Sequence, residues 1–370
     1  MEKKIAVLPG DGIGPEVMEQ AIQVLNAVAT KYNHTFKYCK ASVGACAIDK
    51  YNNPLPDTTL ESCHNSDAIL FGAIGHPRFD NDPDAKIRPE QGLLKLRKSM
   101  GLFCNIRPVT TFPKLLHLSP LRPERVNGVD LVIYRELTGG IYFGDREKDE
   151  AAGTAFDTCK YSVEEITRMA HPAFQAAQKR RKKLTLVDKA NVLESSRLWR
   201  ATVKKVAKEY PDVTLDFMFV DNAAMQLIIN PASFDVILTS NMFGDILSDE
   251  ASVLPGSMGL LPSASIGKGS AMFEPIHGSW PEAAGQDIAN PFAMILSAAM
   301  MLDYFEMTRE AEDIRGAVYA CLENDIGTAD LQTGIRLTCS QIGEIIVSYL
   351  TEGPSAFKAD RLAEGASTII

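Results

Sequence analysis

The sequence lacks the long apolar runs and the excess of positive charge that mark membrane-spanning and nucleic-acid-binding proteins. No apolar run of roughly 18 residues occurs in it, which predicts no transmembrane helix. The opening residues, MEKKIAVLPGDG, contain no apolar segment of the kind found in signal peptides, so we expect a cytoplasmic protein. Aspartate and glutamate total 47 against 38 lysines and arginines, and the net charge of −9 argues against nucleic acid as a partner.

The sequence also lacks paired cysteines. Its seven cysteines are scattered without a C-x-x-C spacing, which is typical of a reduced protein rather than of a disulfide framework or a zinc site. Apolar residues make up 45% and charged residues 23% of the 370 positions, which indicates a globular chain long enough for two domains.

Short apolar runs alternate with helical patterns, which predicts an α/β fold with a largely parallel sheet. Strands are expected at 5–8, 35–43, 67–74, 129–135, 184–189, 213–221 and 234–239, and helices at 14–29, 57–64, 162–179, 193–209, 222–230 and 292–305. Ser162, with Glu165 three positions later, has the spacing of a capping box at the start of one helix. The polar stretch 140–160 is expected to form a protruding arm, and the Gly/Pro-rich stretch 255–291 to interrupt the alternation.

A glycine-rich turn joins the first expected strand to the first helix. It reads PGDGIGPE from Pro9 to Glu16, and glycines at such a place let backbone amides approach an anion at a helix N-terminus. The spacing is not that of a Rossmann fingerprint, and the following strand, which ends near Val43, offers no acidic residue for a ribose. Taken alone, the motif is interpreted equally well as a tight turn without a ligand.

Three arginines occupy positions where an unpaired charge would be costly. Arg107 and Arg135 lie in apolar strand segments, and Arg97 lies in a helical segment at 91–100. A guanidinium in such surroundings needs an anion, and its planar fork suits a carboxylate. An internal salt bridge would explain any one of them. Three together, followed by Tyr142 in the segment TGGIYFG, favour a substrate with more than one carboxylate.

Three aspartates are candidate metal ligands. Asp245 and Asp249 are four residues apart and therefore share one face of an expected helix, although Asp245 alone would also fit the N-cap of that helix. Asp221 ends an expected strand, at the edge where α/β folds bind ligands. Carboxylates without clustered histidine or cysteine indicate Mg²⁺ or Mn²⁺ rather than zinc.

Two further segments are candidates for function. Lys189 ends a buried strand segment, where removal from water favours the neutral amine and lets it act as a base, although an isolated lysine more often extends to the surface. The stretch 273–291 is a long Gly/Pro-rich loop with turn residues and few charges, which favours a functional loop over a disordered one.

Together these segments resemble the isocitrate and isopropylmalate dehydrogenase family of β-decarboxylating enzymes. The resemblance runs from Lys4 to about Tyr349, and its main carriers are LRKS at 96–99, RELTGGIYFG at 135–144 and FGDILSDE at 243–250. It implies a two-domain fold that is not Rossmann. Residues 1–102 and 255–370, with both termini, would form the cofactor-binding domain, and residues 103–254 a central domain that carries the metal ligands and the dimer interface.

The resemblance also implies a role for each candidate residue. The three arginines would hold the substrate carboxylates, and the three aspartates would bind Mg²⁺ or Mn²⁺. Lys189 would take the hydroxyl proton of the substrate, and Tyr142 would return a proton to the enol carbon after CO₂ leaves. In this family Lys189 and Asp221 reach the site from the partner subunit, with Asp221 also near the substrate, so the active unit would be a homodimer.

Substrate and cofactor follow from the same resemblance. Members that act on isocitrate carry Ser and Asn where this chain has Gln91 and Leu93, and Leu93 with Val192 would form an apolar wall for the isopropyl group of isopropylmalate, a leucine-biosynthesis substrate. Glu282 stands where NAD-dependent members have Asp, and its carboxylate would repel the 2′-phosphate of NADP. The residues expected to contact NAD are Ile13, Gly75, Glu90, His277, Gly278, Ser279, Glu282 and Asn290.

Two alternatives stay open on the sequence. One is an enzyme of the same family that acts on another 2-hydroxy acid, such as isocitrate, homoisocitrate or tartrate. The other is a nucleotide-binding protein without redox activity, in which the glycine turn holds phosphate. That second alternative leaves Lys189, Tyr142 and the aspartates without a common purpose.

Overall fold

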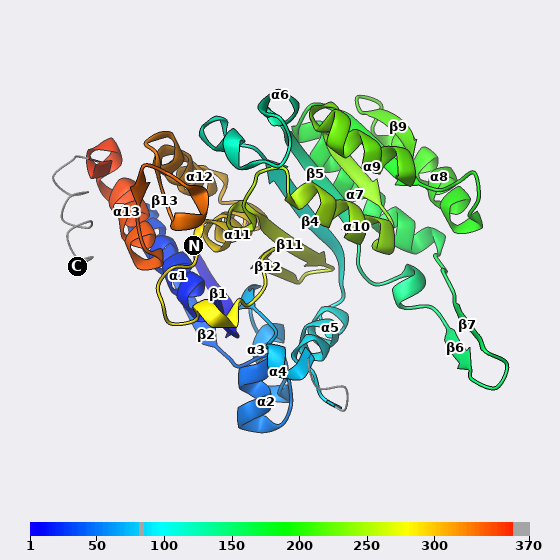
Figure 1. The fold of residues 1–370 in the computed structure, drawn as a ribbon, viewed down its shortest axis with the longest axis horizontal. Coiled ribbons are helices and arrows are strands. Elements are labelled where there is room, and N and C mark those ends of the chain that lie inside the picture. The colour runs from blue at the N-terminus through cyan, green and yellow to red at the C-terminus, as the bar shows by residue number, and fades with distance from the viewer. Residues whose placement is uncertain (81–84, 358–370) are drawn as a thin grey trace. The chain divides into compact units, whose positions relative to one another are not determined.

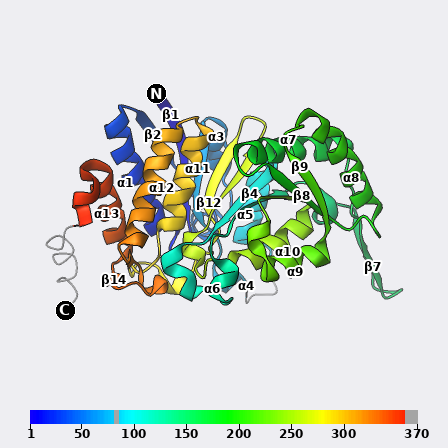
Figure 2. The ribbon, with the colours of Figure 1, turned by 90° about the horizontal axis from the view of Figure 1, so that it is seen from above.

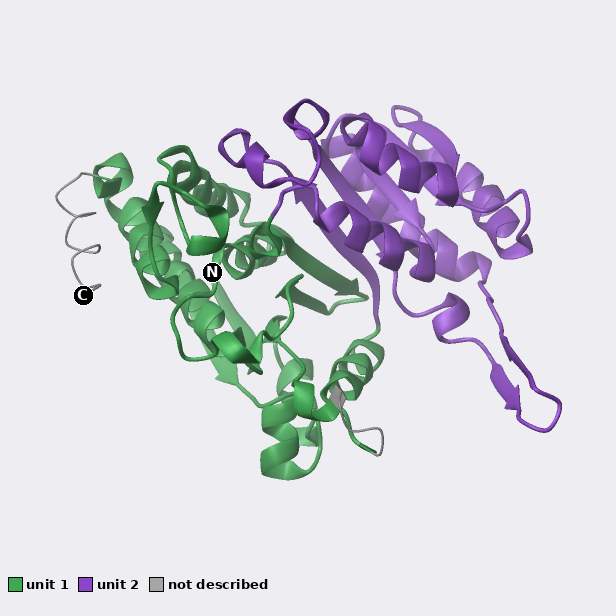
Figure 3. Cartoon of the chain, viewed as in Figure 1, with its two compact units in different colours: residues 1–101, 257–370 green, residues 102–256 purple. Residues whose placement is uncertain are grey.

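The structure is a computed structural model that describes residues 1–80 and 85–357. The chain forms two compact units, Met1–Gly101 with the segment from Ser257 onward (unit 1) and Leu102–Gly256 (unit 2), as Figure 3 shows. The sequence interpretation divides the chain at 102/103 and 254/255; residues 358–370 of its first domain lie outside the described part. The expected α/β fold with a mixed, largely parallel sheet is confirmed.

The sheet of unit 1 runs in the order β2-β1-β3-β12-β11. Its strands are β1 (Glu2–Gly10), β2 (Thr35–Lys40), β3 (Ala68–Ala73), β11 (Pro262–Gly267) and β12 (Ala271–Pro275). The first four in spatial order are parallel, and β11 is antiparallel to β12. All residues of β3 are buried, as expected for a parallel strand covered by helices on both faces.

The helices of unit 1 enclose this sheet. α1 (Gly14–Tyr32) begins with Pro15 in its first turn, and it lies beside α11 (Phe292–Tyr304), α12 (Thr308–Glu323) and α13 (Cys339–Glu352), as Figure 2 shows. The remaining elements are α2 (Ala45–Tyr51), α3 (Asp57–His64), α4 (Pro77–Asp80), α5 (Pro89–Ser99), β13 (Ile326–Gly327) and β14 (Ile335–Arg336). Among the described residues, no helix combines the length and the apolar character needed to cross a membrane.

The sheet of unit 2 runs in the order β4-β5-β10-β8-β9. Its strands are β4 (Leu102–Thr110), β5 (Asp130–Glu136), β8 (Lys183–Asp188), β9 (Thr214–Phe219) and β10 (Val236–Thr239), and only the β4–β5 pair is antiparallel within this order. Its helices are α6 (Pro123–Val126), α7 (Val163–Lys179), α8 (Glu194–Val206), α9 (Val220–Ile229) and α10 (Asn241–Ser252).

Several local predictions are tested directly. Ser162 accepts from the backbone of Glu165 and starts α7, so the capping box is confirmed. The polar stretch 140–160 contains an exposed antiparallel hairpin, β6 (Arg146–Asp149) with β7 (Thr154–Asp157), which projects from the helices of unit 2 in Figure 1. The stretch 255–291 is not irregular throughout, because β11 and β12 lie in it. Their glycines and prolines fall at strand ends, which hides short strands from pattern reading.

Candidate active site

The glycine turn of unit 1 is held by close contacts between backbone atoms. Gly10 and Gly12 have φ values of 72° and 57°, in the left-handed region. A Cβ on Gly10 would lie 1.8 Å from the Ala73 carbonyl oxygen, and one on Gly12 would lie 1.9 Å from the Ser279 carbonyl oxygen. The Ile13 amide donates to that same Ser279 oxygen at 2.8 Å. The turn therefore joins the end of β3 to the 276–290 loop through contacts that no side chain could replace.

Asp11, inside the same turn, is buried and structural. Its carboxylate accepts from the backbone amides of Ala45, Cys46 and Gly75 at 2.8, 2.9 and 3.0 Å. It thus caps the N-terminus of α2 and fixes the residue that follows β3. A side-chain carbon on Gly75 would approach Glu90 Oε1 to 3.0 Å and Ser279 Oγ to 3.6 Å. The fold accordingly brings Ile13, Gly75, Glu90 and Ser279 together.

The expected adenosine loop presents a buried ring nitrogen. His277 Nδ1 lies 3.0 Å from the Gly278 carbonyl oxygen and donates to it, which leaves Nε2 as an acceptor that is buried and has no partner among the described residues. Burial lowers the pKa of His277, so the ring is neutral at neutral pH. Gly278 and Glu282 are exposed, and a Cβ on Gly278 would meet nothing within 4 Å. The loop therefore offers an open backbone, a carboxylate and an unused acceptor.

The second half of this loop is anchored inside unit 1. The Asn290 amide is buried, donates to Asp330 Oδ2 at 3.1 Å and accepts from the Phe292 amide at 3.0 Å. Glu16, in the first turn of α1, accepts from the Gly285 amide. The side chain of Asn290, expected to contact NAD, is therefore bonded to the chain itself at both its nitrogen and its oxygen.

One face of α5 carries Glu90, Leu93 and Arg97, which follow at helical spacing. Leu93 is half-buried, and Arg97 Nη2 donates to Glu274 Oε1 of β12 at 2.8 Å. Arg97 Nε is buried without an acceptor among the described residues. Gln91 Oε1 accepts from the Arg88 amide at 3.2 Å, so this side chain completes the cap of α5.

The arginines of unit 2 lie on neighbouring strands and point to the same face of the sheet. Asn105 of β4 is opposite Arg135 of β5, and Arg107 is two residues beyond Asn105. Arg107 Nη1 donates to Asp249 Oδ1 at 2.8 Å, and Arg135 Nη1 donates to Asp245 Oδ1 at 2.5 Å. The two acceptors are one turn apart on α10. The internal salt bridge that the sequence leaves open for each arginine is therefore present at both, as it is at Arg97.

Tyr142 joins the same cluster. Its hydroxyl donates to Asp245 Oδ2 at 2.8 Å, and burial together with this bond raises the pKa of Tyr142, so the phenol stays protonated at neutral pH. Asp245 is the fifth residue of α10, which begins at Asn241, so its interpretation as an N-cap is wrong. The Asp245 and Asp249 side chains are 35% and 69% exposed, which leaves both open to a ligand.

Lys189 and Asp221 form a separate pair. Lys189 follows β8, and its ammonium lies 2.5 Å from Asp221 Oδ1 with the lysine side chain 27% exposed. This bond lowers the pKa of Asp221. Asp221 lies in the first turn of α9, so its placement at a strand end is wrong by two residues. Val192, in the turn after Lys189, is 62% exposed. Lys189 is therefore only partly exposed in this chain, and its amine is paired with a carboxylate.

The carboxylates of α10 suit a divalent ion, but the described residues of one chain do not bring a complete set of metal ligands together. Asp245 and Asp249 supply carboxylate oxygens, the ligands that Mg²⁺ and Mn²⁺ prefer. Among the described residues no three histidine, cysteine, aspartate or glutamate side chains are grouped to hold a metal. Asp221, the third expected ligand, is bonded to Lys189 instead.

Comparison with known proteins identifies the family. The family model described as isocitrate/isopropylmalate dehydrogenase matches residues 4–346 of this chain. The chain belongs to this dehydrogenase family. It is therefore an oxidoreductase, with the α/β architecture that the resemblance implies.

Relatives and solved structures agree with this assignment. The chain is 54% identical to a 3-isopropylmalate dehydrogenase of Bacteroides fragilis, over 95% of the chain and 99% of the relative. It is 53% identical to the enzyme of that name in Clostridium acetobutylicum, over 94% and 99%. An isocitrate dehydrogenase from Methylococcus capsulatus superposes with a TM-score of 0.82 at 34% identity, over 95% of this chain and 100% of that one. A beta-decarboxylating dehydrogenase from Thermococcus kodakarensis, in its apo form, gives 0.80 at 35%, over 95% and 96%.

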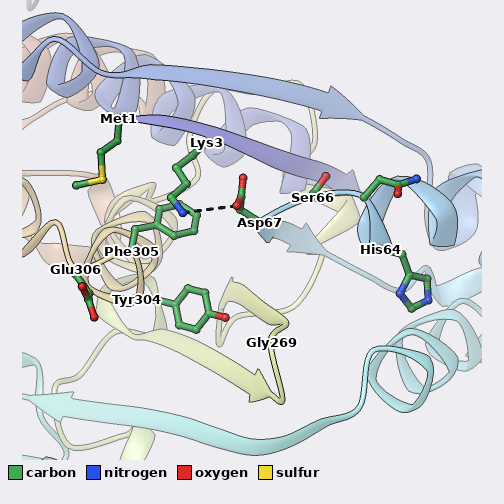
Figure 4. Close-up of a pocket in the computed structure, with 10 residues that line it drawn as sticks. Met1, Lys3, His64, Ser66, Asp67, Gly269, Tyr304, Phe305 and Glu306 are labelled. Carbon is green, nitrogen blue, oxygen red and sulfur yellow. Dashed lines mark ion pairs between the residues drawn. The ribbon is translucent and has the colours of Figure 1, made fainter.

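A surface cavity of about 730 Å³ in unit 1 of this family member involves none of the candidate residues (Figure 4). It lies at the N-terminal ends of β1 and β3, whereas the glycine turn follows the C-terminal end of β1. Lys3 and Asp67 face each other across it with 3.6 Å between Nζ and Oδ1, and the Lys3 ammonium lies over the Phe305 ring. The charges of Lys3 and Asp67 are thus paired with each other.

Sequence reasoning missed residues that hold the candidate site in place. Asp11 was visible in the glycine turn, but nothing in the sequence reveals which amides it accepts. Glu274 contacts Arg97 from β12, which is distant in the chain, and Asn105 contacts Arg107 from two residues earlier on the same strand. Asn241 begins the segment NMFGDILSDE and could have been singled out, because a polar residue at the start of a helix is available to neighbouring groups.

Proposed function

We propose that this chain is an NAD-dependent 3-isopropylmalate dehydrogenase. It oxidises 3-isopropylmalate at the hydroxyl carbon and removes one carboxylate, which yields 4-methyl-2-oxopentanoate and CO₂ for leucine biosynthesis in the cytoplasm. The observation that carries the proposal is the cluster in unit 2, in which two arginines, two aspartates and the Tyr142 phenol are linked by hydrogen bonds. The names and high identities of the relatives support the choice of substrate.

The charge pairs of the cluster suit a site that exchanges internal partners for ligands. Arg107 and Arg135 hold Asp249 and Asp245 in this chain, and a substrate carboxylate can take the place of an aspartate on each guanidinium fork. Arg97, with its unpartnered Nε, is the third carboxylate contact. Asp245, Asp249 and the partner subunit's Asp221 would hold Mg²⁺ or Mn²⁺. The bound ion supplies Lewis-acid stabilisation of the oxygens that become negative during oxidation and decarboxylation.

Two residues move protons. The partner subunit's Lys189 would take the proton of the substrate hydroxyl as a neutral amine, after it has separated from Asp221 and released its own proton to solvent. Bound NAD would supply the acceptor for the hydride. Tyr142 returns a proton to carbon after CO₂ leaves, and its raised pKa keeps that proton in place until it is needed. The hydrogen bond from its hydroxyl to Asp245 aims the phenol at the substrate side of the cluster.

NAD binding is assigned to the loops of unit 1. The unpartnered His277 Nε2 suits the adenine amino group, and the exposed Glu282 carboxylate suits the ribose hydroxyls. Ile13, Gly75 and Glu90 line the turn proposed for the nicotinamide end, with Gly278 and Ser279 between the two ends. Asn290 is the last residue of this NAD-binding set, and its bonds to Asp330 and to the Phe292 amide hold it in place. Leu93 and Val192 supply apolar surface for the isopropyl group.

A homodimer completes the site. Apolar side chains are exposed at helical spacing on α9, at Met225, Ile228 and Ile229, on α10 at Ile246, and at Val253, which caps the end of α10. A row of such side chains on two contacting helices is typical of a protein interface. The same dimer would bring the partner subunit's Lys189 and the partner subunit's Asp221 to the α10 aspartates, which one chain does not assemble.

A steady-state assay of NADH formation tests the proposal. With Mn²⁺ and K⁺ present, kcat/KM for isopropylmalate with NAD should exceed that for isocitrate, homoisocitrate and tartrate, and the value with NAD should exceed that with NADP. A chelator should abolish turnover, and sedimentation should give a dimer. A higher kcat/KM for another 2-hydroxy acid would reassign the substrate. Failure to reduce NAD with any of these acids would favour a nucleotide-binding protein without redox activity.

A further inference from the structure

We propose that Asn241 is a positioning residue that holds Arg135 and the loop of Tyr142 in one fixed arrangement. This inference rests on the proposed function, because it assigns Arg135 to the substrate and Tyr142 to proton return. Asn241 is the first residue of α10 and is 1% exposed. Its side chain is bonded to the protein itself and is shielded from solvent, so its effect on the reaction is exerted through its neighbours.

The amide oxygen of Asn241 orients the Arg135 guanidinium. Oδ1 accepts from Arg135 Nη2 at 3.0 Å and from Nε at 3.3 Å, while Arg135 Nη1 donates to Asp245. The guanidinium is thereby held from two sides, by the first and the fifth residue of the same helix. A planar fork fixed in this way presents a defined edge to an incoming carboxylate, and less rotational freedom is lost on binding.

The amide nitrogen of Asn241 holds the loop that leads to Tyr142. Nδ2 donates to the Gly139 carbonyl oxygen at 3.1 Å, and the Asn241 backbone amide donates to the Tyr161 hydroxyl at 3.0 Å. The Tyr161 ring lies against the same loop, because a Cβ on Gly140 would fall 2.2 Å from the Tyr161 hydroxyl oxygen. Asn241 therefore bonds both Arg135 and Gly139, which lies three residues before Tyr142.

The remaining contacts of this loop do not substitute for Asn241. The buried Glu136 carboxylate accepts from the amides of Thr138 and Gly139 and so shapes the bend after β5. As an acceptor it cannot bond the Gly139 carbonyl oxygen. Loss of the Asn241 side chain would thus leave that buried carbonyl without its donor and the guanidinium freer to turn, without removing the bend itself.

The test compares Asn241→Ala and Asn241→Asp with the wild-type dimer. Asn241→Ala should raise KM for isopropylmalate roughly tenfold and lower kcat to a similar extent, with KM for NAD unchanged. Asn241→Asp keeps the side-chain volume and an oxygen toward Arg135 but loses the donor to Gly139, so kcat should fall as in the alanine variant. Hydrogen exchange of the amides at 139–142 should be faster in both variants.

Thr239→Val is the matched control. Thr239 is fully buried two residues earlier, and its hydroxyl donates to the Val187 carbonyl of β8 rather than to the Gly139 carbonyl that Asn241 holds. The substitution should lower stability without changing KM, kcat or loop exchange. If Asn241→Ala does not fold, Tyr161→Phe serves in its place, because it removes only the hydroxyl that accepts from the Asn241 backbone amide. This variant should still show faster hydrogen exchange at 139–142 and a lower kcat.

The outcomes separate this inference from the proposed function. Wild-type kinetics in the Asn241 variants, with loop exchange unchanged, would overturn the positioning role. Wild-type KM and kcat per folded molecule with reduced stability alone would do the same. A wild-type enzyme that oxidises no 2-hydroxy acid would remove the proposed function, and the exchange measurement would still decide whether Asn241 holds the loop.

Discussion

The two units differ in the chemical groups that they contribute to the candidate site. In unit 1 the turn around Gly12 and the loop after His277 present mainly backbone, held by carboxylates such as Asp11 that accept from main-chain amides. In unit 2 the β4, β5 and α10 elements present charged side chains that pair with one another. The first arrangement depends on backbone clearance, and the second depends on charge.

This difference sets how each unit responds to change. A site made of closely packed backbone has no alternative arrangement, so an added methyl group costs folding energy directly. A site made of paired charges can exchange partners, so a ligand or an isosteric substitution alters affinity and rate more than stability. The following experiments test this comparison.

Lys189→Ala should give the largest effect. Loss of the base should lower kcat about a thousandfold while KM for isopropylmalate changes little. Steady-state and substrate-binding measurements check this separately. Lys183→Ala removes a similar lysine–aspartate pair at the other end of β8, with Asp216, and should leave kcat unchanged. An equal loss of turnover and binding would make Lys189 a binding residue.

Gly12→Ala should lower the stability of unit 1. Positive φ and a Cβ position 1.9 Å from the Ser279 oxygen predict a loss of about 3 kcal/mol in the free energy of unfolding. Urea unfolding measures it. Gly316→Ala, at an exposed position of α12 with nothing within 4 Å of the added carbon, should instead stabilise by about 0.5–1 kcal/mol. Equal effects of the two substitutions would contradict the backbone-clearance argument.

Asp245→Asn should mainly weaken the binding of the divalent ion. The apparent affinity for Mn²⁺ should fall about thirtyfold because one anionic oxygen ligand is lost, whereas the unfolding free energy should change little. Activity titrated with Mn²⁺, supported by calorimetry, provides the measurement. Asp216→Asn in β9 is the control with the same chemical change. An unaltered Mn²⁺ titration would exclude Asp245 from the ligand set.

Glu282→Lys should alter the choice of cofactor. Replacing a carboxylate beside the proposed ribose site with an ammonium should shift the ratio of kcat/KM for NADP over NAD upward about tenfold. Glu312→Lys, an equal change of charge on exposed α12, should leave the ratio as it is. If both variants keep the wild-type ratio, Glu282 does not face the ribose.

The pH dependence of stability should show the smallest effect. Burial holds the folded-state pKa of His277 below 6.5, so the unfolded chain binds the proton more readily. The contribution of His277 to stability is present above pH 6.5 and is lost as pH falls from there through the lowered pKa of the folded state. His277→Gln should remove this part of the pH dependence in urea unfolding, and His64→Gln at an exposed position should not.

Local patterns were sufficient for much of the fold. The alternation of apolar runs and helical periodicity located most strands and helices, and the Ser162 capping box fixed the start of α7. The strands β11 and β12 escaped because proline and glycine at their ends read as loop. Residue type alone also identified Arg107, Arg135 and Asp245 as candidates, since charge in an apolar segment requires a partner.

The sequence by itself determined which side chains are available: the left-handed glycines of the turn, the forked arginines and the aspartates one helical turn apart. Tertiary structure alone decided the partners. Arg135 meets Asp245 and Asn241 only because β5 and α10, more than a hundred residues apart, lie together. Spacing along the chain governs neighbours within a helix or strand, whereas hydrogen bonds between elements depend on packing, which no short-range pattern encodes.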